Sequence, residues 1–133
     1  MGLSRVEVRA ALIQKVQDNT GPLGMPVYHE NRDEPDLDKV KPVFLHVGVD
    51  FTEAVRADVN VLAYNTGLLV LTLYTRVGEG VVVELSAADH LDVSLSRQLV
   101  QGISLGVMTP GRKTPSKTGW RCTEWLIPFS YYS

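Results

Sequence analysis

The stretch 68-LLVLTLYTR-76 organises the predicted fold, because it is apolar at nearly every position from Leu68 to Leu73. A strand that is apolar on both faces is typical of the middle of a sheet with at least one face covered by helix. Asp58–Tyr64 is a second strand-like run, and Asn65-Thr66-Gly67 joins the two. Since Gly adopts the positive φ that a three-residue hairpin loop requires, we predict an antiparallel hairpin here.

Further strands are predicted on both sides of this hairpin. In Pro42–Asp50 the residues Val43, Leu45, Val47 and Val49 alternate with the others, which predicts a strand with one face in the core. Pro26–Glu30 has the pattern of a short strand, and Gly102–Met108 that of a weak one.

The closing segment, Trp120–Tyr132, is also predicted to be a strand. One face carries Trp125, Ile127, Phe129 and Tyr131, and Cys122 has the opposite parity. Pro128 withdraws one backbone donor from the sheet, so it favours an edge position or a strand end.

Two segments have the periodicity of helices. The first, Ser4–Asp18, opens on Ser4 with Glu7 three residues later, the spacing of a capping box. Its apolar stripe consists of Val8, Ala11, Leu12 and Val16.

The second helix is predicted to begin near Val82, although Val81-Val82-Val83 also has strand propensity. Its apolar residues recur every three or four positions, and its charged residues fall where a helix faces water. The predicted core positions are Leu85, Ala88, Leu91, Leu95 and Leu99, and the predicted solvent positions are Glu84, Asp89, Asp92 and Arg97.

The order of these elements predicts an α+β fold, with two helices packed on one face of a mixed, mostly antiparallel β-sheet. The 133 residues are 44% hydrophobic and carry a formal net charge of -2, which fits a single domain over 1–133 and excludes a globally basic nucleic-acid binder. A single cysteine excludes an internal disulfide and favours a reducing compartment. The most apolar run, Val59–Tyr74, is shorter than the about 20 continuous apolar residues of a spanning helix, so we expect no membrane partner.

No pattern for catalysis, a cofactor or a metal is present in the sequence. Each of the three histidines, His29, His46 and His90, lies in a strand or helix pattern without a nucleophile or ligand motif around it. We therefore predict that the protein is not an enzyme and has no catalytic, cofactor or metal site.

The placement of charge is more informative than its amount. The predicted loop Asn31–Lys41 is acidic and the predicted loop Thr109–Gly119 is basic. Two loops of opposite sign are suited to a self-assembling ring, because such pairs orient association, although both loops being solvated is an equal alternative. The candidate interface residues are Asp33, Glu34, Asp36 and Asp38 in the first loop and Arg112, Lys113 and Lys117 in the second.

Across nearly its whole length the sequence resembles the tail terminator-like proteins of tailed phages and prophages. The order, spacing and size of the pieces carry the resemblance. The pieces are Arg9-Ala10-Ala11-Leu12 in the first helix, the strand ending Glu30-Asn31, Pro42-Val43-Phe44-Leu45, Tyr74 with Gly78 and Gly80, Ala88-Asp89, and Gly119-Trp120 with Ile127-Pro128-Phe129.

The resemblance implies a structural role in a virion. Such proteins form a homohexameric ring on the last ring of the tail tube, end its polymerisation and provide the surface to which the head or neck docks. The implied partners are further copies of the chain, the major tail tube protein and a head or neck connector protein, with DNA only passing through the lumen. The implied location is the head-proximal end of the tail, after synthesis in the host cytoplasm, and the family has no catalytic motif to transfer.

Three alternatives stay open at this point. A head–tail connector or tail-completion protein has the same size and ring habit. A small α+β ligand-binding domain or enzyme would use His29 or His90 in a pocket between helix and sheet. A nucleic-acid module would use Arg112, Lys113, Lys117 and Arg121 for phosphate contacts and Trp120 for stacking.

Overall fold

The computed structural model describes residues 2–29, 43–56, 63–78, 81–114 and 119–133.

Helix α1 (Arg5–Thr20) confirms the first predicted helix and extends it by two residues. The predicted capping box is present, since the Ser4 hydroxyl accepts from the Glu7 N–H and the Glu7 carboxylate accepts from the Ser4 N–H, both at 3.1 Å. The hydrogen bond from the Ser4 N–H to the Glu7 carboxylate, followed by the interaction of that carboxylate with the Ser4 hydroxyl, holds the pKa of Glu7 below its ordinary value. A short 3-10 turn, η1 (Gly21–Leu23), follows, and then β1 (Val27–His29).

The long hairpin joins β2 (Val43–Arg56) to β3 (Ala63–Arg76), so the prediction of a turn at Asn65-Thr66-Gly67 is wrong. These three residues lie inside β3 and pair with β2 on one side and β7 on the other. Gly67 is not one of the glycines with a positive φ. A Cβ atom at this position would overlap the Phe129 ring and the Asp50 carbonyl. This Gly therefore serves close packing rather than chain reversal, and residues 57–62, most of the predicted first strand, lie outside the described residues.

In the described residues the sheet has seven strands in the order β1-β2-β3-β7-β5-β4, with β6 also paired to β7. Among these strands β1 and β2 pair in parallel and the other pairs are antiparallel, so the sheet is mixed and mostly antiparallel, as predicted. The central position predicted for Leu68–Leu73 is confirmed, because β3 lies between β2 and β7. The remaining strands are β4 (Leu99–Val100), β5 (Ile103–Leu105), β6 (Arg112–Thr114) and β7 (Trp120–Tyr132).

Pro128 lies inside the sheet, so the prediction that it marks an edge or a strand end is wrong. Strand β7 pairs with β3 on one side and with β5 and β6 on the other. The Pro128 carbonyl accepts from the Gly106 N–H at 2.7 Å. Because the amide and carbonyl of one strand residue point to the same side, the missing donor faces Gly106, between the pairings with β5 and β6. Pro128 thus costs no hydrogen bond with β3.

Helix α2 (Val81–Leu95) confirms that Val81-Val82-Val83 is helical, but its buried face differs from the prediction. Leu85 and Leu99 are 59% and 74% exposed, and Leu99 belongs to β4. Glu84, predicted to face water, is buried together with Ala87, Leu91 and Leu95. The predicted face containing Leu85 and the observed face containing Glu84 start one residue apart, so helical spacing hardly distinguishes them. The hydrogen-bonding and ionic partners of the Glu84 side chain decide that the face with the acid is buried.

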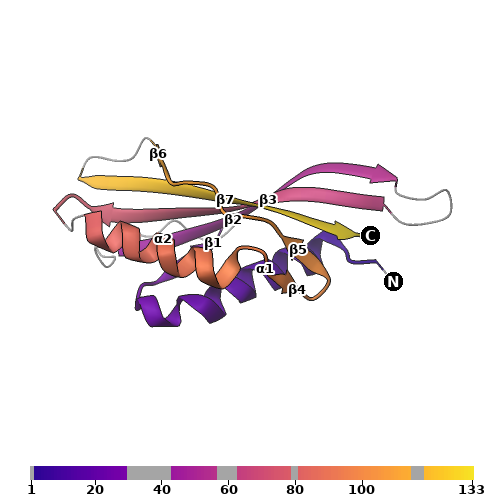
Figure 1. The fold of residues 1–133 in the computed structure, drawn as a ribbon, viewed down its shortest axis with the longest axis horizontal. Helices are drawn as coiled ribbons and strands as arrows, with labels where there is room; N and C mark the ends of the chain where they lie inside the picture. Colours follow the sequence, from indigo (N-terminus) through magenta and orange to yellow (C-terminus); the bar gives the residue numbers. More distant parts are fainter. Residues whose placement is uncertain (1, 30–42, 57–62, 79–80, 115–118) are drawn as a thin grey trace.

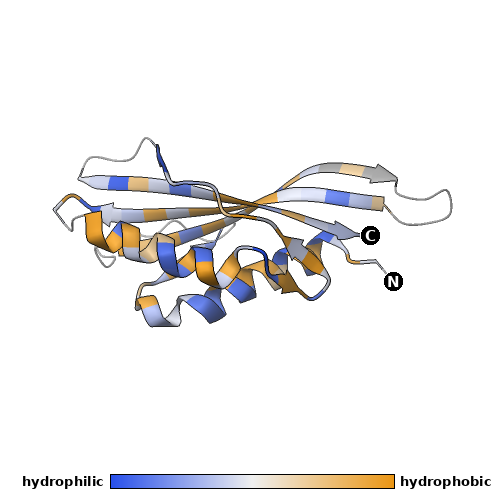
Figure 2. Ribbon diagram, in the orientation of Figure 1, coloured by the Kyte–Doolittle hydropathy of each residue, from blue (hydrophilic) through white to orange (hydrophobic). Residues whose placement is uncertain are grey.

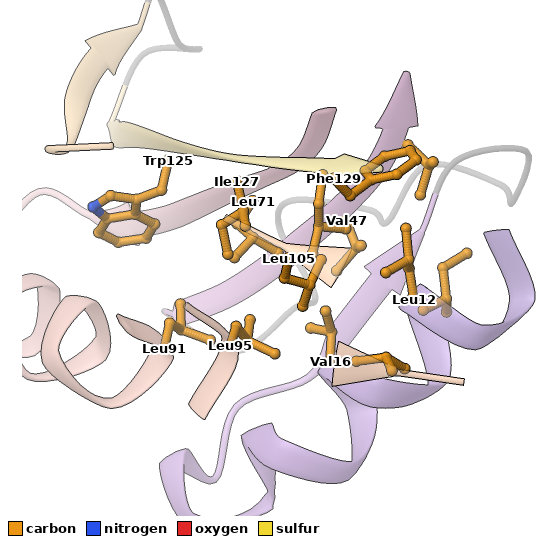
Figure 3. Packing of buried hydrophobic residues seen from close by; sticks show 14 of the residues in the cluster. Leu12, Val16, Val47, Leu71, Leu91, Leu95, Leu105, Trp125, Ile127 and Phe129 are labelled. Carbon is orange, nitrogen blue, oxygen red and sulfur yellow. The ribbon is translucent and has the colours of Figure 1, made fainter. Parts of the chain in front are cut away.

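Both helices cover the same face of the sheet, which confirms the predicted α+β architecture (Figure 1). Between the layers lies one apolar core, in which Trp125 is on the side of Leu91 and Phe129 on the side of Leu12 (Figure 3). The predicted alternation of faces along β7 is confirmed. The rings of Trp125 and Phe129 are buried beneath the helices, and Cys122 is buried on the opposite face of the sheet.

A second group of aromatic rings lies on the sheet face away from the helices. The Phe44 ring stacks on Tyr74 with centroids 4.7 Å apart and meets Tyr28 and Trp120 edge-on at 5.4 and 5.3 Å. The Arg76 guanidinium lies 4.8 Å from the centroid of the Trp120 ring. These contacts bury Phe44 and Trp120 without a helix above them.

Candidate assembly surface

The basic segment predicted as a loop contains β6, which is held against β7 and α2 by an ion cluster. The Lys113 ammonium donates to the Glu84 carboxylate and, at 2.9 Å, to the Thr123 hydroxyl. The Thr123 hydroxyl donates to the same oxygen of Glu84, and the Arg121 guanidinium lies 3.8 Å from its other oxygen. This cluster, Glu84 with Lys113, Arg121 and Thr123, joins α2 to two strands.

Glu84 is the centre of the cluster and the residue that sequence reasoning missed. Its side chain is only 11% exposed, whereas those of Lys113 and Arg121 are 55% and 37% exposed. A buried carboxylate is stable only with cationic and hydrogen-bonding partners, and all of them come from strands far along the chain. The signal available in the sequence was an acid one helical turn before Ala87 and two turns before Leu91, on the face that is buried.

Replacement of Glu84 by Ala is expected to lower the free energy of unfolding by about 2 kcal/mol, because Thr123 loses its buried acceptor and two cations lose their partner. Urea denaturation followed by circular dichroism measures the loss. The matched control is Glu124→Ala, which removes a more exposed ion pair of Arg112 and should cost well under about 1 kcal/mol. Equal losses for the two variants would contradict the role assigned to Glu84.

The second cation of β6 has a different environment. The Arg112 guanidinium contacts the Glu124 carboxylate at 3.0 Å, and its side chain remains 73% exposed. Arg112 is therefore the described candidate interface residue with the most accessible charge. Lys113 is also accessible at its surface, but its ammonium is engaged in the ion cluster.

The other candidate interface residues lie outside the described residues. They are Asp33, Glu34, Asp36 and Asp38 in the acidic segment and Lys117 in the basic one. The pairing of an acidic loop with a neighbour's basic loop thus stays a prediction.

Neither of two hollows lined by described residues contains a histidine. His90 contacts the carbonyl of Asn19 and lies 3.5 Å from the Ser94 hydroxyl, so it joins α2 to the end of α1. A hollow of about 380 Å³ between α1 and the β4–β5 turn is lined by residues such as Glu7, Gln14 and Gln101, and includes none of the histidines. The reading of a ligand pocket around His29 or His90 gains no support from this geometry.

A stacking site for nucleic acid also gains no support. The Trp120 ring is 7% exposed and is covered by Phe44 and Arg76. Lys113 and Arg121 both contact Glu84, which reduces the positive charge available for phosphates.

The described part of the chain contains neither a cluster of metal ligands nor a helix of membrane-spanning length. No group of three or more His, Cys, Asp or Glu residues there is arranged to hold a metal ion. None of the described helices has the length and apolarity needed to cross a bilayer.

Comparison with known proteins finds likeness in structure. No protein-family model and no curated protein matches the sequence. A solved structure whose name states no function has a TM-score of 0.72 at 16% identity, over 98% of this chain and 96% of that chain. A chain in the virion of a native gene transfer agent particle has a TM-score of 0.66 at 15% identity, over 93% of both chains. At these identities the likeness establishes the fold, which this chain therefore shares over nearly its full length with a chain of a virion particle.

Proposed function

We propose that this protein is a non-enzymatic structural protein of a phage-like virion, and more specifically a tail terminator. The observation that carries the proposal is the likeness in fold, over 93% of both chains, to a chain of a gene transfer agent virion. The match covers nearly the whole domain rather than a common substructure; because one fold can host several roles, the role itself is assigned by the assembly experiment below. The resemblance of the sequence to tail terminator-like proteins points to the same class.

In this role the protein forms a homohexameric ring at the head-proximal end of the tail. The ring binds the last ring of the major tail tube protein, ends its growth and presents a docking surface to the head or neck connector protein. DNA passes through the lumen without being bound, which agrees with a net charge of -2. The charged residues proposed for the subunit interface are Arg112, Lys113 and Lys117 with Asp33, Glu34, Asp36 and Asp38.

Electron microscopy of negatively stained mixtures tests this function. The purified protein is added to tail tubes growing from the major tail protein encoded next to it. We expect caps at one end of each tube and a fixed tube length. Binding to the portal or head end instead of to tubes would contradict termination and favour a connector or tail-completion role, and binding to neither would overturn the virion role.

Arg112→Glu is expected to weaken ring formation and capping at least tenfold while the monomer stays folded, because the Arg112 side chain is 73% exposed and its ion pair is with the surface residue Glu124 rather than with the buried Glu84. Light scattering gives the oligomer size and circular dichroism the fold. The control is Lys15→Glu on α1, which makes the same change of charge away from β6. Lys113→Glu, which reverses the charge at the neighbouring residue, is a poorer test, because it places a second carboxylate beside Glu84 and so lowers stability as well. Unchanged capping by the Arg112 variant would remove β6 from the interface.

A further inference from the structure

Exposed apolar side chains gather at two places in the described part of the molecule. The large exposed apolar residues are Val6, Tyr64, Val77, Val81, Val82, Leu85, Val93, Leu99, Val107 and Tyr132. Four of them, Val77, Val81, Val82 and Leu85, form what we call the end patch. Tyr64 and Tyr132 form what we call the tyrosine pair. Single exposed apolar residues are ordinary, but a contiguous group of four is typical of an interaction site.

The end patch lies where β3 ends and α2 begins. Val77 follows β3 and its N–H donates to the Gly119 carbonyl at 2.9 Å, which places it beside the start of β7. Val81, Val82 and Leu85 occupy the first turns of α2 and are 48%, 74% and 59% exposed. Figure 2 shows this start of α2 as an apolar end of the molecule. A helix face turned to water is normally polar, so the patch indicates a contact with another molecule.

The tyrosine pair lies where β2 and β3 extend past the helices. Tyr64 and Tyr132 are register partners of β3 and β7, with ring centroids 5.5 Å apart. They are 38% and 52% exposed, on the sheet face away from the helices. In Figure 1 the ends of β2 and β3 project at the opposite end of the long axis from the start of α2.

We propose that the tyrosine pair of one copy docks on the end patch of the next copy, so that copies associate head to tail. The two surfaces lie at opposite ends, so one chain cannot cover its own. A two-fold dimer through either surface would leave the other in water, whereas a head-to-tail contact covers both and repeats until a ring closes. This inference rests on the ring of the proposed function and names the surfaces that build it.

Cations border the end patch in the described part of the chain. The side chains of Arg112, Lys113 and Arg121 are 73%, 55% and 37% exposed, whereas those of Glu84 and Glu124 are only 11% and 21% exposed. Among these described residues the water-accessible charge is therefore positive.

On the sheet face that carries the tyrosine pair, Asp50 is exposed and pairs with Leu68, four residues along β3 from Tyr64. Aromatic rings attract guanidinium groups, so an Arg112 side chain of the next copy suits the tyrosine pair, and Asp50 adds an acid on the same face. This complementarity favours a second copy of the chain as the occupant.

Two variants with one damaged surface each test the direction of assembly. Val82→Glu damages the end patch and Tyr132→Glu damages the tyrosine pair. The matched control is Val93→Glu, at a side chain that is 79% exposed on the same helix but outside the patch. Sedimentation velocity measures the size of each variant and of a one-to-one mixture of the first two, and circular dichroism checks that each is folded. Val82→Lys replaces Val82→Glu if the latter does not fold.

We expect the wild type and the Val93 control to form the ring, and each damaged variant to remain a monomer. The mixture should contain dimers and nothing larger, because one intact tyrosine pair meets one intact patch and the remaining surfaces are both damaged. A ring from Val82→Glu, or a mixture that remains monomeric or restores the full ring, would overturn the inference.

The same proteins separate this inference from the proposed function. If Val82→Glu assembles and caps tubes as the wild type does, the interface is wrong and the function stands. If the wild type forms rings through these surfaces but never caps tubes, the inference stands and the function fails. A wild type that is monomeric both in solution and on tube ends overturns the inference.

Discussion

Replacement of Trp125 by Ala is expected to lower the free energy of unfolding by about 4 kcal/mol. The indole is 2% exposed and lies in the core between the sheet and α2 (Figure 3). Gly111 packs against it, since a Cβ at Gly111 would lie 2.8 Å from the indole nitrogen. Truncation leaves a cavity bounded by backbone on that side, which cannot collapse easily.

Urea denaturation followed by far-ultraviolet circular dichroism measures this loss, because the variant lacks one of the two tryptophans that report by fluorescence. Trp125→Phe should recover more than half of the loss by filling most of the volume. Val93→Ala, at an exposed position of α2, is the control and should change stability by less than about 0.5 kcal/mol. A loss below about 1 kcal/mol for Trp125→Ala would contradict the close packing of this side chain.

Gly67→Ala is expected to cost about 3 kcal/mol, although it adds a single methyl group. That methyl group would overlap the Phe129 ring on β7 and the Asp50 carbonyl on β2. Since β3 is paired on both sides here, neither strand can move away without loss of ladder hydrogen bonds. The Phe129 ring is 2% exposed in the core, and the Asp50 oxygen belongs to the backbone, so neither group moves aside cheaply.

Thermal and urea unfolding of Gly67→Ala and Gly21→Ala give the comparison that tests this. Gly21 has φ -49° and open space around its Cβ position, so its substitution should be neutral or slightly stabilising. If Gly67 had the positive φ of a hairpin loop, as its sequence neighbourhood suggests, the cost would be about 1 to 2 kcal/mol. A loss of about 1 kcal/mol or less would contradict the paired position of Gly67.

Local sequence was sufficient wherever the partner groups are close along the chain. The capping box of Ser4 and Glu7 involves residues three positions apart, so the start of α1 was predictable. The parity of Trp125 and Cys122 follows from the two-residue period of a strand, and the apolar run from Leu68 placed β3 in the middle of the sheet. The α+β class follows from the order of such elements.

Contacts between distant segments decided the features that were predicted wrongly. Gly67 suits a turn by itself and becomes a strand residue because Phe129 needs its empty Cβ position. Pro128 is tolerated inside the sheet because its missing donor faces Gly106, whose carbonyl accepts from the Arg97 N–H instead. Glu84 rather than Leu85 faces inward because Lys113 and Thr123, on other strands, compensate its charge.

The same distinction holds for the assembly surface. The sequence identifies Arg112 and Lys113 as cations in a basic segment, but folding brings Lys113 to an internal acid and leaves Arg112 accessible. Helical periodicity assigns Leu85 to the core, and only the packed structure exposes it beside Val82. Periodicity reports the spacing of side chains along an element, whereas exposure depends on which neighbour covers each face, and that neighbour is chosen by the whole chain.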